Sequence, residues 1–167
     1  HIGKSADTPI KTLTISGNLN FDTVAEPTAA QQTAMVLTNT GAGSIEAGTY
    51  YYAVKYYTAE GDTGHTTGHN TLPSITSADA FKVTVSNIPC SPDPRVIGRK
   101  VYRSQAGTVG DYYFCYHIGT IADNTTTTYN DNSPRNTSST DWIYNKNNTT
   151  AGITYRDGAV YTRLADY

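Results

Sequence analysis

The stretch GTYYYAVKYYTAEGDTG, residues 48 to 64, has five tyrosines within eight consecutive positions, and its pattern is the main indication of the fold. In a β-strand successive side chains point to opposite faces. One face would then carry Tyr50, Tyr52, Val54 and Tyr56. The other would carry Tyr51, Ala53, Lys55 and Tyr57. Since a lysine rarely lies in a core, we expect the face with Lys55 to be the wetter one. Inward tyrosines need partners for their hydroxyls, so we expect their oxygens near water at sheet ends or corners.

A period of two recurs along most of the chain. It predicts strands at residues 34–40, 49–59, 80–88, 99–104, 111–121 and 125–131. The breaks between them are rich in Gly, Pro, Asn and Asp. A short helix is expected only within residues 21–35, as a turn after Pro27. Several short strands without intervening helices predict an all-β fold, a β-sandwich.

Alternation also assigns faces in two further strands. In residues 80–88 it turns Phe81, Val83 and Val85 inward. In residues 111–121 it turns Tyr112, Phe114, Tyr116 and Ile118 inward, and Tyr113, Cys115 and His117 outward. Cys90 and Cys115 could form one disulfide, but two free thiols are the expectation, because disulfide frameworks usually show more cysteines.

The composition of this chain of 167 residues excludes some function classes. Charged residues make up 16% and the formal net charge is -2, while Thr, Ser and Asn supply most of the polar surface. Such β-prone composition is typical of extracellular or virion-borne proteins. There is no cluster of Lys and Arg, so we expect no nucleic-acid partner. There is also no apolar run of eighteen residues, so we expect no membrane insertion.

Several motifs together point to a known family. They are GTYYYAVKYYTAEGDTG, FKVTVSNIP, GRKVYRSQAG, YYFCYHIGTI and TTTTYND, and they span residues 34 to 131. This arrangement resembles the fibronectin type III-like (Ig-like) modules of bacteriophage tail, fibre, baseplate and head-decoration proteins. In that family the V-Y-R and T-Y-x-D strands precede the tyrosine strand, so the resemblance implies a permuted strand order here. It implies an Ig-like sandwich over residues 34–131 and a virion protein.

The flanks differ from this central part. Residues 1–33 and 132–167 are polar and rich in Asn or Pro, so we expect extended N- and C-terminal arms. The N-terminal arm could hold a hairpin at residues 12–21 around Gly17-Asn18. The C-terminal arm has short strand-like pieces. Neither arm can bury a core alone, so we expect them to pair with the same sheet or with another subunit.

Candidate binding residues lie on the wetter face and in the loop that follows it. They are Tyr51, Tyr57, Asp62, His65 and His69. Tyrosines in such a place can serve as paratope-like contacts, although outward rings also commonly support neighbouring strands. His65 and His69 have the H-x-x-x-H spacing but lie in a Gly/Thr loop rather than on a helix, so no metal site is expected. A calcium loop at residues 122–131 is equally disfavoured, because the D-x-D-x-D-G spacing is missing.

No catalytic constellation is recognisable, so we expect no enzyme and no cofactor. The main hypothesis is a non-enzymatic structural protein on the virion surface, a fibre, spike or capsid-decoration subunit. Its expected partners are copies of itself and other virion subunits, with a host-surface glycan as a further candidate. The alternative is a secreted or cell-surface module for carbohydrate binding or adhesion.

Overall fold

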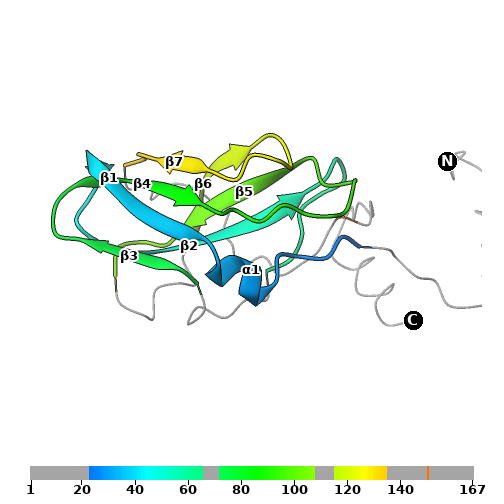
Figure 1. Cartoon of the computed structure of the whole chain (residues 1–167), viewed down its shortest axis with the longest axis horizontal. Coiled ribbons are helices and arrows are strands. Elements are labelled where there is room, and N and C mark those ends of the chain that lie inside the picture. Colours follow the sequence, from blue (N-terminus) through cyan, green and yellow to red (C-terminus); the bar gives the residue numbers. More distant parts are fainter. Residues whose placement is uncertain (1–22, 66–71, 108–114, 135–149, 151–167) are drawn as a thin grey trace, which may run out of the picture.

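The protein is an all-β sandwich of two antiparallel sheets, seen in the computed structural model (Figure 1). The structure describes residues 23–65, 72–107, 115–134 and 150. One sheet has the order β1-β4-β7, and the other has the order β3-β2-β5-β6. The elements are α1 (Ala29–Thr33), β1 (Val36–Ile45), β2 (Gly48–Tyr57), β3 (Ser74–Ser77), β4 (Phe81–Ser86), β5 (Gly98–Arg103), β6 (Tyr116–Ile121) and β7 (Tyr129–Asp131). The predicted fold class is therefore confirmed, while its assignment to the Ig-like group stays a prediction.

The strands differ from the expected ones most clearly at β1, β3 and β7. β1 runs on to Ile45, through glycines that were expected to end it, and two register shifts between Asn39 and Ile45 absorb them. Gly41 has φ +108°, a backbone conformation that glycine adopts without steric cost. β3 was missed because its sequence, SITS, lies within a Gly- and Pro-rich break. β7 begins only at Tyr129, and the expected hairpin at residues 12–21 lies outside the described residues.

The core between the sheets follows the predicted alternation. Tyr50, Tyr52, Val54 and Tyr56 of β2 are at most 3% exposed. Phe81, Val83 and Val85 of β4 face them, and Met35, Ile45, Ile88, Val101 and Ile121 complete the cluster. The inward assignments in β2 and β4 are confirmed, and Ile118 of β6 packs against the same cluster as predicted. Tyr112, Tyr113 and Phe114 lie outside the described residues.

A glutamine side chain supplies hydrogen-bond partners to backbone groups at the outer edge of β2. α1 begins with a capping box, in which Thr28 and Gln31 exchange side-chain-to-backbone hydrogen bonds. The next residue, Gln32, is fully buried, donates from Nε2 to the Val54 carbonyl at 2.7 Å and accepts from the Val54 N–H at 3.1 Å. On either side, Tyr52 N–H donates to Pro73 O and Thr63 N–H donates to Tyr56 O. The amide of Gln32 therefore stands in for a neighbouring strand.

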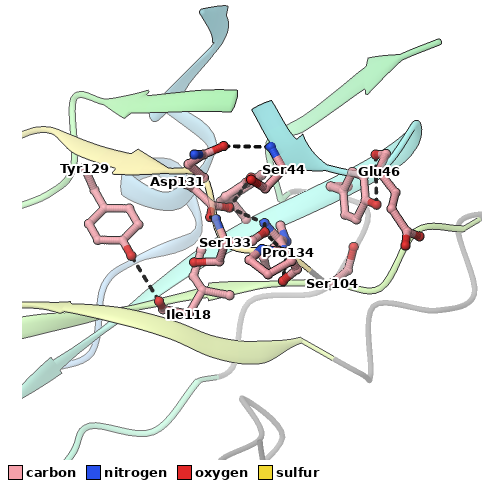
Figure 2. A network of polar contacts seen from close by, with 12 residues as sticks. Ser44, Glu46, Ser104, Ile118, Tyr129, Asp131, Ser133 and Pro134 are labelled. Atoms are coloured by element: carbon pink, nitrogen blue, oxygen red, sulfur yellow. Dashed lines mark hydrogen bonds and ion pairs between the residues drawn. The ribbon is translucent and has the colours of Figure 1, made fainter. Parts of the chain in front are cut away.

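A buried ion pair joins the two sheets (Figure 2). Arg103 of β5 donates from Nη1 to Asp131 Oδ2 of β7 at 2.6 Å, and the two side chains are 4% and 0% exposed. Tyr52 donates its hydroxyl to the same carboxylate oxygen at 2.7 Å. Burial raises the pKa of Tyr52, and the Asp131 charge raises it further. The expectation that inward tyrosine oxygens lie near water is thus wrong for Tyr52, because Asp131 supplies a buried partner.

A second tyrosine closes the side of the sandwich where β6 and β7 lie. Tyr129 donates its hydroxyl to the Ile118 carbonyl of β6 at 3.0 Å (Figure 2). Its ring occupies the place that a side chain at Gly119 would take, since a Cβ there would overlap the Tyr129 ring. Gly119 is therefore required by this close approach.

We predict that Gln32→Glu lowers the free energy of unfolding at pH 7 by about 3 kcal/mol, because it buries a charge and removes the donor to Val54 O. Urea unfolding followed by circular dichroism measures this loss. Gln31→Glu is the matched control, since a carboxylate can still accept from Thr28 N–H, and it should change stability by less than about 0.5 kcal/mol. Equal effects at the two positions would contradict the role assigned to the Gln32 amide.

Candidate functional site

Those predicted binding residues that the structure describes lie on or beside the outer face of the four-stranded sheet, but this face is partly covered. Ala53, Leu72, Tyr102 and Cys115 form a second buried cluster there, with Tyr51 packed against it. Tyr51 and Tyr57 are half-buried, so this is the wetter face of β2, as expected, but Lys55 itself is only 2% exposed. The physical reason is that the chain after β2 turns back over the sheet and brings His65 and Leu72 onto it.

The outward assignment of Cys115 is confirmed, because Cys115 packs with Ala53 and Tyr102, but the outer face is covered there as well. Cys115 is fully buried in the second cluster, and burial raises the pKa of its thiol to about 12. Cys90 is half-buried, and neither cysteine is disulfide-bonded, as expected. Tyr51 is half-buried and supports Tyr102 and Leu72, which is the ordinary structural role of an outward ring.

Basic and aromatic side chains alternate across this face. The Lys55 ammonium lies 5.6 Å from the centre of the Tyr102 ring, within the range of a cation–π contact. The Tyr102 ring packs against the His117 ring at 5.6 Å between centroids. His117 Nε2 lies 3.1 Å from Thr120 Oγ1. Lys55 and His117 have the outward position that the sequence predicts. Tyr102 and Lys100 were not singled out from the sequence, although their pairing with β2 gives them the same outward parity.

His65 lies over the sheet with a buried ring nitrogen. Within the described part of the chain, Nε2 has no hydrogen-bond partner. Burial lowers the pKa of His65 to about 4, and the neighbouring Lys55 charge acts in the same direction. His65 is therefore neutral at pH 7. His69 belongs to the segment 66–71, outside the described residues, so the expectation that His65 and His69 form no metal site stays a prediction.

Tyr57 and Asp62 mark the end of β2 where the loop begins. Thr58 organises the turn, because its N–H donates to Gly61 O and its Oγ1 accepts from the N–H groups of Glu60 and Gly61. The backbone of Asp62 then forms a β-bridge with Tyr57. This return places Asp62 Oδ2 2.6 Å from Lys100 Nζ, and each side chain remains about a quarter exposed. Tyr57, Asp62 and Lys100 thus form an accessible group.

A separate hollow lies at the end of the sandwich beside Tyr56. It has a volume of about 540 Å³ and lies between residues 23–31 and the loop 91–95. Pro92, Pro94 and Tyr56 line it, and Arg95 bonds Asp93 at 2.7 Å on its rim. Val24 packs beneath it with Tyr56 and Val96.

The acidic residues of the loop before β7 have structural partners. Asp123 accepts from the backbone N–H groups of Thr125 and Thr126, and these hydrogen bonds hold the pKa of its carboxyl below the usual range. Arg99, fully buried, donates to the carbonyls of Asp123 and Thr126. Among the described residues, no three His, Cys, Asp or Glu side chains are grouped as a metal would need. No helix in the same part is long and apolar enough to cross a membrane.

Comparison with protein-family models, with curated proteins and with solved structures finds no match for this chain. The resemblance of residues 34–131 to fibronectin type III-like phage modules therefore stays a prediction.

We predict that stability falls as the pH is lowered from about 6.5 to 4, because the unfolded state binds a proton at His65 in this window and the folded state does not. The expected loss is on the order of 2 to 3 kcal/mol, measured by urea unfolding at several pH values. Nuclear magnetic resonance should place the His65 ring titration near pH 4.

In His65→Gln the free energy of unfolding should change less between about pH 6.5 and 4. The matched variant His117→Gln should show the same pH dependence as the wild type. An unchanged profile in His65→Gln would refute the burial that we assign to this ring.

Proposed function

We propose that the chain is a non-enzymatic structural protein of a virion, a fibre, spike or capsid-decoration subunit that acts in assembly. The observation that carries this proposal is a hydrogen bond between the two flanks. The N–H of Val24 donates to Thr150 Oγ1 at 2.8 Å, and the two residues are 0% and 3% exposed. Val24 and Thr150, which lie close to the ends of the segments 1–22 and 151–167 in the sequence, are therefore side by side at one end of the sandwich.

This end is built into the fold rather than loosely attached. Val24 packs with Tyr56 of β2 and Val96, and Gln32 is bonded into the edge of β2. A pull on either flank would therefore be transmitted to the four-stranded sheet. Two flanks that leave one end of a sandwich can hold a particle or neighbouring copies while the opposite end projects, which is the geometry that a fibre or decoration subunit needs.

The sequence motifs support the same proposal. The stretches that resemble phage fibronectin type III-like modules supply β2, β4, β5, β6 and β7 of the sandwich. On this proposal the module is Ig-like with permuted strand order, the protein lies at the virion surface, and its partners are its own copies and other virion subunits. A secreted or cell-surface adhesion module would instead be monomeric.

Light scattering after size-exclusion chromatography tests the proposal. The full chain of 18.0 kDa should elute as a trimer or as a larger polymer. Deletion of residues 1–22, and separately of 151–167, should return it to a monomer, because the flanks carry the contacts.

The control addresses the long edge strand β1, which offers another route to association. Thr38 is exposed on β1, and a lysine there blocks edge-to-edge pairing. Thr38→Lys should leave the assembly intact. A monomeric full chain, or an assembly that Thr38→Lys dissolves and the deletions do not, would contradict the proposal.

A further inference from the structure

We propose that the outer face at Tyr57 binds a neutral pyranose sugar. The site consists of the Tyr57 ring, the ion pair of Asp62 and Lys100, and the Thr120 hydroxyl. This goes beyond the proposed role in assembly and does not depend on it, because Tyr57 lies on the outer face of the four-stranded sheet, whereas Val24, bonded to Thr150, packs against Tyr56 on the inward side.

The first element of the site is an aromatic platform. Tyr57 pairs with Gly98 across β2 and β5, and a Cβ at Gly98 would overlap both Cε1 and Oη of Tyr57. The ring therefore lies across the backbone of Gly98, and its accessible side is turned away from the sheet. The π face of an aromatic ring is negative, so it attracts the slightly positive C–H groups on the apolar face of a pyranose.

The second element is a matched hydrogen-bond donor and acceptor. Lys100 lies diagonally across from Tyr57, because it pairs with Lys55 in the β2–β5 register. Its Nζ is 2.6 Å from Asp62 Oδ2, with the two side chains 26% and 28% exposed. A sugar hydroxyl both donates and accepts, so two adjacent hydroxyls can bond the carboxylate and the ammonium together.

The third element extends this polar row across the sheet. Thr120 of β6 pairs with Lys100 of β5 and is exposed. Its Oγ1 lies 3.1 Å from His117 Nε2, which orients the hydroxyl. From β2 to β6 the row spans about 10 Å, which gives room for more than one sugar ring.

The charges favour a neutral sugar over an acidic one. Asp62 and Lys100 form an ion pair, so the formal charges of the two site residues cancel. His65 is neutral at pH 7 and adds none.

Saturation-transfer difference NMR on the full chain tests the site, with the methyl glycosides of glucose, galactose, mannose and N-acetylglucosamine as probes at millimolar concentration. At least one should receive saturation through its ring C–H protons. Tyr57→Leu should reduce that signal at least fivefold, because the platform is lost. Tyr57→Phe is the matched variant, and it should retain the signal because the ring still covers Gly98.

Lys100→Met should also weaken the signal at least threefold, whereas Thr84→Ala on the opposite sheet should not change it. Absence of saturation transfer to all four glycosides in the wild-type chain would overturn the proposal. An equal signal in Tyr57→Leu would do so too. Light scattering on the same samples distinguishes this failure from a failure of the assembly proposal, since none of these substitutions lies in the flanks.

Discussion

The buried pair of Arg103 and Asp131 is the constraint on which the rest of the structure depends. It lies between the two sheets, with 4% and 0% exposure, so neither charge is hydrated. A buried pair adds little net stability over apolar packing, but loss of one partner costs about 3 to 5 kcal/mol. Any arrangement that separated β7 from β5 would therefore leave Arg103 or Asp131 buried without its partner. The same carboxylate accepts from Tyr52, so β2, β5 and β7 meet at one atom.

The pair also directs the chain as it leaves β7. Arg103 donates to the carbonyls of Ser133 and Pro134, and Asp131 Oδ1 accepts from Ser133 N–H at 2.9 Å (Figure 2). At the N-terminal side the amide of Gln32 has the equivalent role, because it binds the segment before β1 to Val54. Within the described residues, both flanks are thus tied to the four-stranded sheet through side chains. Assembly through the flanks and recognition at Tyr57 would then use opposite faces of the same end of β2.

Alternation along the tyrosine strand was enough to predict the sandwich and the core side of β2 and β4, because a period of two is a local property. Alternation could not predict that Lys55 is buried, since the segment that covers Lys55 comes from a Gly/Thr loop with no periodic pattern. The hydrogen bonds of Gln32 and the ion pair of Arg103 and Asp131 could not be predicted from the sequence either. Their partners lie 22 and 28 residues away, and only the folded registers bring them together. Of the candidate site, Tyr57 and Asp62 were predicted, while Lys100 and Thr120 follow only from pairing across β5 and β6.

An experimental density map of the assembled particle would show which end of the sandwich is bound. We expect the end with Val24 and Thr150 to face the particle or the neighbouring copies, with residues 1–22 or 151–167 making the contacts and the opposite end projecting outward. A map in which this end points to solvent, or one in which the chain is a compact monomer without symmetry contacts, would contradict this expectation.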